Sequence, residues 1–327
     1  MATKWNGLMK RSAGILAFAS LAVAAPAVAQ QSQSDSLLTV NHYLDLEQVA
    51  NPQISPDGKT IVYSRGWIDK QNDKWESAIW VMNADGTKNR FLVKGGSPIW
   101  SPDGTRIAYV APGEAPKGAQ IFVRYMDAEG GTSQVTRLTE GPGSLQWSPD
   151  GKWLSFTKVV PKTDPTTLTV DMPAAPPNAK WTPGPRVVER LHYRMDRSGY
   201  SEVGFTHLFV VPADGGSPRQ LTSGDWSVGN AFDGLTFGAQ YDWLPNGKTI
   251  VIEGLNEPDA DLTYRDGNIY AVDVATAAIK RLTPERGSWS HPVISPDGSK
   301  IAYTGYPFVK QTYRVADLYV MNADGTG

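Results

Sequence analysis

Few side chains in this sequence could carry out covalent chemistry. The 327 residues contain no cysteine, which excludes disulfides, thiolate nucleophiles, iron–sulfur clusters and cysteine-bearing zinc sites. The four histidines are His42, His192, His207 and His291. The serine nearest to a nucleophile motif is Ser201, but the segment 199–203 lacks the closing glycine of Gly-x-Ser-x-Gly. We therefore expect no catalytic residue and interpret each histidine as a structural or exposed imidazole.

Three aspartates gather in one short segment, Asp259, Asp261 and Asp266, followed by Gly267. Carboxylate oxygens suit calcium, but the spacing departs from the EF-hand pattern and lacks its distal glutamate. We interpret the segment as a solvated loop and expect no metal site. The sequence has no glycine-rich phosphate loop and no basic aromatic stripe, so neither a cofactor nor a nucleic-acid partner is expected.

A repeat organises the elements that must position any functional side chain. Four Ser-Pro-Asp-Gly tetrapeptides and one Leu-Pro-Asn-Gly variant begin at residues 55, 101, 148, 244 and 295, with steps of 46, 47, 96 and 51 residues. Proline presets the backbone of the second turn position, and glycine takes the left-handed conformation that closes a hairpin. Each tetrapeptide therefore predicts a tight turn between two strands.

The residues around these turns alternate with period two, which is the pattern of strands. A further apolar strand recurs downstream, at residues 79–82, 121–123, 208–211, 269–272 and 318–321. A short fourth strand follows and is predicted to end at Arg137-Leu138-Thr139, Arg219-Gln220-Leu221-Thr222 or Arg281-Leu282-Thr283. Four antiparallel strands in about 40–50 residues, repeated in tandem, are typical of β-propeller blades.

The expected fold is all-β: a β-propeller of the TolB-like type with about five four-stranded blades over residues 37–327. The last blade is expected to be incomplete, because Gly327 comes before a fourth strand. A long β-sandwich would not need the same turn at the same offset five times. Since one blade cannot bury both faces of its sheet, Trp100, Trp147 and Trp243 are predicted to pack between neighbouring blades.

Blade 3 is predicted to carry an insertion at about residues 158–206, since the apolar third strand comes much later than in the other blades. The first half of the insertion is rich in proline and threonine and is interpreted as an irregular loop. Residues 186–193 alternate as a strand that leads into Asp196-Arg197-Ser198-Gly199. Long loops on a rigid scaffold are where binding sites are commonly found.

The first 29 residues have the layout of a secretory signal peptide. Lys4, Lys10 and Arg11 precede an apolar run that is too short to span a membrane, and Ala29 ends a small-residue cleavage site. We expect cleavage after Ala29, a flexible lead-in at residues 30–36, and a periplasmic or secreted protein without a membrane segment. Removing three cations changes the net charge from −2 to −5, which disfavours nucleic acid and anionic lipid as partners.

The Ser-Pro-Asp-Gly blades, the stretch Trp181-Thr-Pro-Gly-Pro-Arg-Val-Val-Glu-Arg-Leu-His-Tyr-Arg-Met-Asp-Arg-Ser-Gly-Tyr200 and the strand starting at His207 carry a resemblance. Together they resemble the N-terminal propeller of the prolyl oligopeptidase family of serine peptidases, in its acylaminoacyl-peptidase and dipeptidyl-aminopeptidase branch. The resemblance implies an α/β-hydrolase domain with a Gly-x-Ser-x-Gly-Gly nucleophile after the propeller. No segment of this sequence matches that domain, so the chain is expected to be inactive alone.

The resemblance also implies how the propeller would meet a substrate. Propellers of this family gate peptide access, and the dipeptidyl branch holds the free α-ammonium of its substrate with a pair of glutamates in a propeller arm. Two carboxylates can accept the hydrogen bonds of an ammonium group. The sequence has no adjacent Glu-Glu pair, so the resemblance nominates Glu189 and Glu202 as substrate-binding residues, with a solvated loop face as the alternative.

Three functional interpretations remain open. The first is the propeller portion of an exported serine peptidase, with peptide hydrolysis carried out by a catalytic domain outside this sequence. The second is a free-standing periplasmic TolB-like propeller that binds other proteins. The third is a small propeller closed on itself, in which residues 37–40 supply the fourth strand of the last blade.

Overall fold

The structure, a computed structural model, describes residues 37–327 except 128, 163–172, 183–187, 189–190, 192, 196–198, 201–203, 230–238, 261 and 312–313. By its internal contacts the chain forms two compact units, Met1–Asp45 and Leu46–Gly327. Among the residues described, no helix has the length and apolar content needed to cross a bilayer.

In the first unit, residues 37–45 contain the short helix α1 (Val40–Leu44). Thr39 is its N-cap: the Thr39 hydroxyl accepts the backbone N–H of His42 at 3.2 Å, and the His42 ring accepts the backbone N–H of Thr39 at 3.4 Å. This geometry differs from the self-closed alternative, in which residues 37–40 would form an extended strand. Threonine at an N-cap satisfies helix backbone donors locally, which favours the helix.

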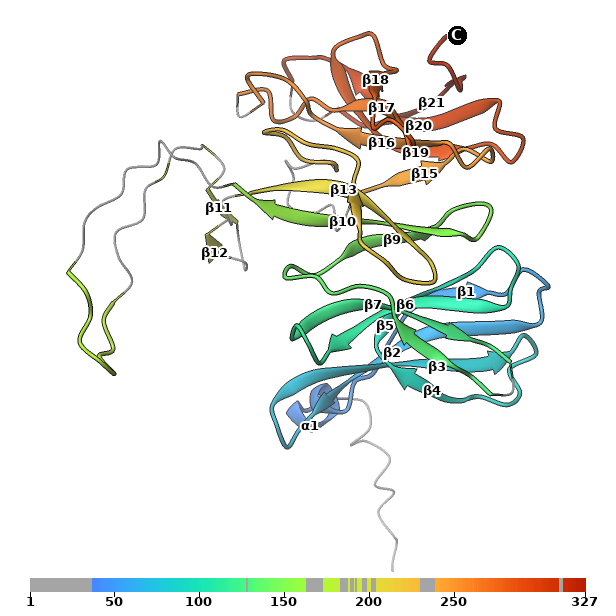
Figure 1. Ribbon diagram of the computed structural model, residues 1–327, viewed down its shortest axis with the longest axis vertical. Coiled ribbons are helices and arrows are strands. Elements are labelled where there is room, and N and C mark those ends of the chain that lie inside the picture. Colours follow the sequence, from blue (N-terminus) through green and yellow to red (C-terminus); the bar gives the residue numbers. More distant parts are fainter. Residues whose placement is uncertain are drawn as a thin grey trace, which may run out of the picture. The chain divides into compact units, whose positions relative to one another are not determined.

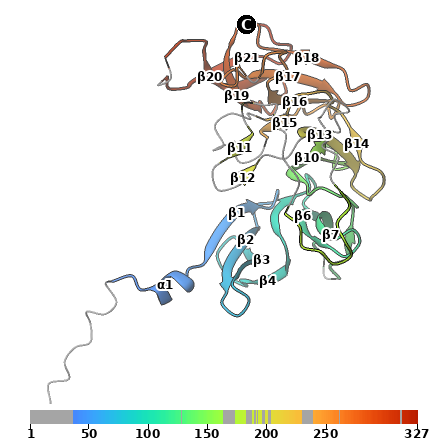
Figure 2. The same ribbon diagram turned by 90° about the vertical axis from the view of Figure 1, so that its left-hand side faces the viewer.

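The second unit consists of antiparallel sheets that follow one another in chain order (Figures 1 and 2). Blade 1 consists of β1 (Gln48–Ile54), β2 (Thr60–Asp69), β3 (Lys74–Asn83) and β4 (Arg90–Lys94). Blade 2 consists of β5 (Gly96–Trp100), β6 (Arg106–Gly113), β7 (Gly118–Tyr125) and β8 (Thr132–Gln134). Blade 3 is β9 (Gly143–Trp147), β10 (Trp153–Pro161), β13 (Gly204–Pro212) and β14 (Arg219–Gln220). Blade 4 consists of β15 (Tyr241–Trp243), β16 (Thr249–Gly254), β17 (Asn268–Asp273) and β18 (Ile279–Arg281). Blade 5 consists of β19 (Gly287–Ile294), β20 (Lys300–Pro307) and β21 (Asp317–Asn322). The all-β propeller blades expected from the sequence are thus confirmed.

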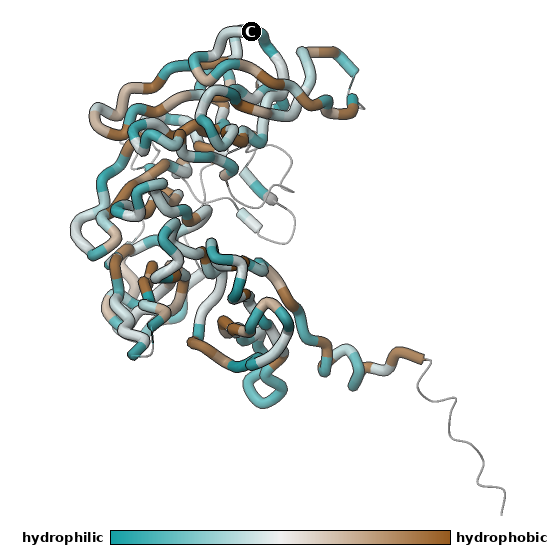
Figure 3. Tube along the Cα trace, turned by 90° about the vertical axis from the view of Figure 1, so that its right-hand side faces the viewer, coloured by the Kyte–Doolittle hydropathy of each residue, from teal (hydrophilic) through white to brown (hydrophobic). Residues whose placement is uncertain are grey.

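The five predicted turns join the first and second strands of the five blades. Their glycines, at positions 58, 104, 151, 247 and 298, all have φ between 66° and 73°, the left-handed region that glycine adopts without strain. In the four Ser-Pro-Asp-Gly turns the serine hydroxyl donates to the aspartate Oδ1 at 2.6 Å. Polar turns and apolar strand segments alternate along the chain trace in Figure 3.

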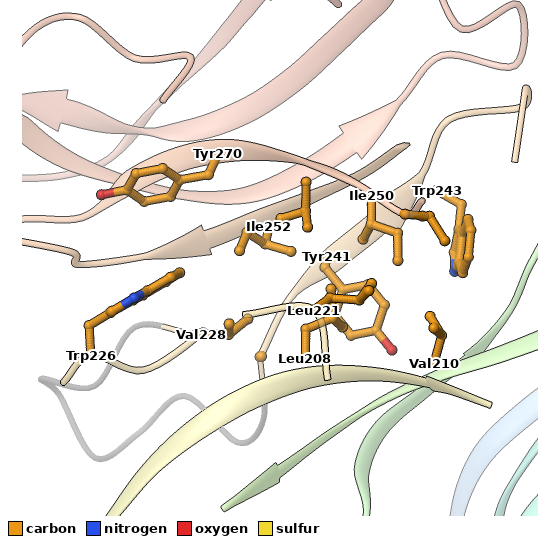
Figure 4. Packing of buried hydrophobic residues seen from close by; sticks show 13 residues of the cluster. Leu208, Val210, Leu221, Trp226, Val228, Tyr241, Trp243, Ile250, Ile252 and Tyr270 are labelled. Carbon is orange, nitrogen blue, oxygen red and sulfur yellow. The ribbon is translucent and has the colours of Figure 1, made fainter. Parts of the chain in front are cut away.

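Each pair of successive blades shares one hydrophobic cluster. Buried residues that meet across these interfaces include Val62 and Ile107, Ile121 and Leu154, Val210 and Ile250, and Ile269 and Ile301. Figure 4 shows the interface between blades 3 and 4, where Leu208 and Val210 face Ile250 and Ile252. Burial of apolar side chains between sheets, rather than within one sheet, therefore stabilises the unit.

The three tryptophans predicted to pack between blades do so. Each donates its indole N–H to the preceding blade: Trp100 to the Gln53 carbonyl at 3.1 Å, Trp147 to the Ile99 carbonyl at 3.3 Å, and Trp243 to the Ser155 hydroxyl at 2.8 Å. Trp147 and Trp243 are buried, and Trp100 is half-buried against its cluster. The polar atom of each ring thus finds a partner in the preceding blade.

Two predicted boundaries were wrong. β10 runs to Pro161 and β13 starts at Gly204, so the insertion occupies residues 162–203 rather than about 158–206; the β-branched and aromatic residues at both margins extend the pairing. In blade 2 the fourth strand ends at Gln134, followed by Val135-Thr136, and not at Arg137-Leu138-Thr139. The alignment of this segment with β7 places Thr136 beside Ile121, and the Thr136 hydroxyl accepts the Ile121 N–H at 2.9 Å.

Candidate functional site at the loop end of the blades

The loops between the second and third strands of every blade lie at one end, which we call the loop end. The tight turns between the first and second strands lie at the opposite end, where turns of successive blades contact each other. Gly104 lies against Pro56, Gly151 against Pro102, and Gly298 against Pro245. The loops of blades 1 and 2 are short. Longer loops follow Pro161 in blade 3, Gly254 in blade 4 and Pro307 in blade 5.

The blade 3 loop is the enlarged one, and it starts from a long antiparallel strand pair. β10 and β13 pair over nine consecutive positions, from Trp153 with Pro212 to Pro161 with Gly204 (Figure 1). At the start of the loop, Lys162 Nζ contacts Asp225 Oδ2 at 2.7 Å. The base of the insertion is therefore held on one side by strand pairing and on the other by an ion pair.

Part of the insertion forms a two-stranded hairpin, β11 (Arg194–Met195) with β12 (Gly199–Tyr200). The Tyr193 and Tyr200 rings lie 6.1 Å apart, and the Arg194 guanidinium lies 5.9 Å from the centre of the Tyr200 ring. Arg194 begins β11, whereas the strand predicted at 186–193 is not seen at Val188, Leu191 or Tyr193. An exposed aromatic and cationic surface is thus present on the enlarged loop.

The nominated substrate-binding residues Glu189 and Glu202 lie outside the described residues, as do Ser201 and His192. The structure describes the frame around them: Val188 and Leu191 flank Glu189, and Gly204 begins β13 two positions after Glu202. Their role in binding stays a prediction.

The three described histidines take part in structural contacts. His207 is buried on β13, where its Nδ1 lies 3.1 Å from the Thr222 hydroxyl, and burial lowers the pKa of His207 below its ordinary value. His291 lies in the bulge of β19 with φ of 56°, and its Nδ1 lies 2.9 Å from the Ser290 hydroxyl. These rings contact hydroxyl groups, which orient an imidazole without making it a base for a nucleophile.

Two carboxylates that the sequence analysis did not single out join blade 4 to blade 5, the buried Glu253 and the half-buried Asp242. Glu253 is 1% exposed, and its Oε2 accepts the His291 N–H at 2.7 Å. Asp242 Oδ2 accepts the Ile294 N–H at 2.8 Å, and burial raises the pKa of Asp242 above its ordinary value. Both carboxylates hold the bulged backbone of β19, so they are anchors of the blade interface.

A sequence signal for Glu253 does exist, in the position it occupies within the repeat. Glu253 lies nine residues after the start of its turn at Leu244, and Ser64 lies nine residues after Ser55. Ser64 accepts the N–H of Ser97, a left-handed bulge residue of the next blade, as Glu253 accepts that of His291. In blades 1 and 4 this position thus makes a polar contact to the following blade, whereas in blade 2 it is the apolar Val110.

The aspartate-rich loop of blade 4 is held by side chains of the protein itself. Arg286 Nε contacts Asp266 Oδ2 at 2.5 Å, and Asp259 accepts from Thr263; Asp261 lies outside the described residues. In the part of the chain that the structure describes, no three His, Asp or Glu side chains are grouped so as to hold a metal ion.

Comparisons with known proteins connect this architecture to peptidases. No protein-family model matches the chain. It is 26% identical over 285 residues to dipeptidyl-peptidase 5 of Porphyromonas endodontalis, which covers 84% of this chain and 39% of that protein. It is also 26% identical over 195 residues to the uncharacterized peptidase YuxL of Bacillus subtilis, covering 57% of this chain and 28% of that protein.

Among solved structures, Pyrococcus horikoshii acylaminoacyl peptidase superposes with a TM-score of 0.61 at 17% identity, over 86% of this chain and 39% of that one. This likeness confirms the fold. The chain spans about two fifths of the length of this peptidase and of the Porphyromonas relative.

Proposed function

The chain corresponds to the N-terminal propeller region of peptidases of the prolyl oligopeptidase family, and on that premise we propose that it gates the access of peptides to a serine-type catalytic domain. The observation that carries the proposal is the match to dipeptidyl-peptidase 5 over 84% of this chain, which amounts to 39% of that relative. Hydrolysis is assigned to an α/β-hydrolase domain in the remainder of a longer polypeptide.

The loop end supports a gating role. The enlarged loop of blade 3 starts from nine consecutive strand pairs, so its side chains are presented from a regular antiparallel base. Its described part exposes Arg194, Tyr193 and Tyr200, side chains that can contact the backbone and apolar groups of a peptide. We assign selection by size and by the N-terminal group of the peptide to this loop.

The coding sequence beyond Gly327 gives the first test. A reading frame that reaches Gly-x-Ser-x-Gly-Gly within about 250 residues, one to two domains, supports the proposal. Replacing that serine with alanine in the longer protein should abolish peptide hydrolysis. A stop codon directly after Gly327 would instead support the free-standing binding propeller.

Recognition of the substrate α-ammonium is the finer part of the proposal. In the longer protein, Glu189→Gln and Glu202→Gln should each lower kcat/KM on free-amine dipeptide substrates by about 10–100-fold, since each removes a charged acceptor. Hydrolysis of the same substrates with an acylated N-terminus should be unchanged. Glu114→Gln, in the exposed blade 2 loop at the same end, is the matched control. Unchanged kcat/KM on free-amine substrates would contradict the assignment.

The last part of the proposal is that the protein is exported from the cytoplasm. Residues 1–36 lie outside the described residues, and the proposal depends on the basic, apolar and small-residue pattern that ends at Ala29. N-terminal sequencing of the protein recovered from the periplasm or medium should begin at Gln30. Recovery from the cytoplasm with Met1 intact would exclude it.

A further inference from the structure

Blade 2 places an arginine in the groove that it shares with blade 3. Arg106 lies five residues after the start of its turn at Ser101, and its side chain is 13% exposed. The guanidinium lies 4.9 Å from the centre of the Trp147 ring, donates to the Gly151 carbonyl at 3.0 Å and donates to Asp214 Oδ1 at 3.2 Å. Blade 3 thus holds a guanidinium with an aromatic face, a turn carbonyl and a carboxylate.

Blade 2 offers the same three groups to its own preceding neighbour, blade 1. Trp100 comes directly before its turn, as Trp147 does in blade 3. Gly104 is the fourth residue of that turn, as Gly151 is in blade 3. Asp127 follows the third strand at the same offset as the blade 3 aspartate, two residues beyond the partner of the residue that begins the second strand. The groove between blades 1 and 2 therefore has the means to hold a guanidinium.

Blade 1 supplies no guanidinium at this position. The residue five after the start of its turn is Thr60, whose short side chain cannot lie over Trp100 as Arg106 lies over Trp147. Trp100 is half-buried, whereas Trp147 is 8% exposed. The groove between blades 1 and 2 contains a pocket of about 420 Å³, and its lining includes Thr60, Trp100, Gly104 and Met126. The space taken by an arginine side chain in one groove is thus open in the other.

The remaining two interfaces differ from this one. Between blades 3 and 4 the corresponding residue is Trp153, which packs against the hydrophobic cluster that contains Trp243. Between blades 4 and 5 it is Thr249, but Ile294 stands in place of the tryptophan before the turn. Among the blades that the structure describes, blades 1 and 2 alone combine a short residue on one side with a tryptophan face on the other.

The pocket also contains cations, which come from blade 1. Lys88 and Arg90 line it from the segment that connects β3 to β4 and from the start of β4. Arg90 pairs with Val81, and the corresponding residue of blade 2 is the neutral Ser133. These cations are therefore an addition to the repeated pattern, and they suit a carboxylate on the ligand. A molecule with a guanidinium at one end and a carboxylate at the other matches both sets of groups.

We propose that the pocket between blades 1 and 2 binds arginine with a free carboxylate, either as the amino acid or at the C-terminus of a peptide. The guanidinium stacks on Trp100, donates to the Gly104 carbonyl and faces the Asp127 carboxylate, as Arg106 does in the next groove. The ligand carboxylate pairs with Arg90. The site lies at the end of the blades opposite the loop end, so it is independent of the proposed gating of a catalytic domain.

Isothermal titration calorimetry on the protein encoded by the complete reading frame tests the ligand. L-Arginine should bind saturably at one site, and binding of N-acetylglycyl-arginine would extend the site to peptide C-termini. L-Citrulline, in which a neutral urea group replaces the guanidinium, should bind at least about tenfold more weakly. Agmatine, which lacks the carboxylate, should bind about tenfold more weakly than L-arginine. Equal affinities for L-arginine and L-citrulline, or no saturable binding of L-arginine, would overturn the proposal.

Variants of blade 1 test the location. Thr60→Arg gives blade 1 the side chain that blade 2 has at Arg106, so it should fill the pocket and abolish L-arginine binding with unchanged circular dichroism. Thr249→Arg makes the same change in blade 4, where no tryptophan faces it, and should retain binding as the matched control.

The exposed Arg90 supplies a variant that does not alter the packing of the blade. Arg90→Gln should weaken L-arginine binding about tenfold and leave agmatine binding unchanged, because agmatine has no carboxylate to pair with this residue. A folded Thr60→Arg protein that binds L-arginine with unmodified affinity would exclude the pocket. Equal loss of L-arginine and agmatine binding in Arg90→Gln would contradict the orientation given to the ligand.

Discussion

Replacing Thr222 with valine removes one hydroxyl group from blade 3 and keeps the shape of the side chain. Thr222 is 1% exposed, and its hydroxyl accepts the Leu208 N–H at 3.0 Å and lies 3.1 Å from Nδ1 of His207. Leu208 and His207 are also buried. The valine variant would therefore leave a backbone donor and an imidazole nitrogen without a partner and without access to water.

The size of the effect follows from these two groups. A buried polar group left without a hydrogen bond costs about 1–3 kcal/mol, so we expect the free energy of unfolding to fall by about 2–4 kcal/mol. Replacing an exposed threonine in a turn should change it by less than about 0.5 kcal/mol. Thr326→Val is the matched control, since Thr326 is exposed in the turn after β21.

Urea unfolding followed by tryptophan fluorescence measures the difference. The chain has eleven tryptophans, whose emission together reports global unfolding. One of them, Trp226, is 5% exposed and lies edge-on to the His207 ring at 6.4 Å. A Thr222→Val chain that unfolds at the same urea concentration as the Thr326→Val control would refute the role given to the threonine hydroxyl.

Three further outcomes are expected. Burial lowers the pKa of His207 below 6.5, so the neutral ring is favoured in the folded state. The free energy of unfolding should therefore fall as the pH drops through 6.5. In the His207→Asn variant, the urea midpoints at pH 7.5 and pH 5 should differ less than in the unmodified chain. Trp243→Phe should lower the free energy of unfolding by about 1–3 kcal/mol, since it removes the indole donor to Ser155 and leaves a small cavity; an unchanged thermal midpoint would argue against that contact. Hydrogen bonds from the Ser295 hydroxyl and from the N–H and hydroxyl of Ser299 lower the pKa of Asp297 to about 2, so the contribution of this carboxylate to stability is lost as the pH falls from 3.8 to 2. NMR titration should show that Ser295→Ala moves the pKa of Asp297 part of the way back toward 3.8.

The turns and the inter-blade tryptophans could be predicted from the sequence because their chemistry is local. A Pro-Asp-Gly segment specifies its own backbone, and a large aromatic residue beside it must be buried somewhere. With the turns placed, the alternation of apolar residues on either side assigned the strands and the blades.

Features decided by residues distant in sequence could not be predicted. Val135-Thr136 and Leu138-Thr139 are three residues apart and equally suited to end a strand, and only pairing with β7 selects the first. Glu253 could not be singled out as an inter-blade contact, because its partner His291 belongs to the next blade. Glu189 and Glu202 lie outside the described residues, so their placement is left to experiment.

The long β10–β13 ribbon allows the enlarged loop to change in sequence without changing the blade below it. Because Pro161 and Gly204 are already held together, lengthening the segment between them adds only closure entropy, about 0.6 kcal/mol for each doubling of its length. Exchange of this loop for one of different length or charge should therefore leave the packing of blade 3 intact. The length and charge of this loop can therefore change while the scaffold stays the same.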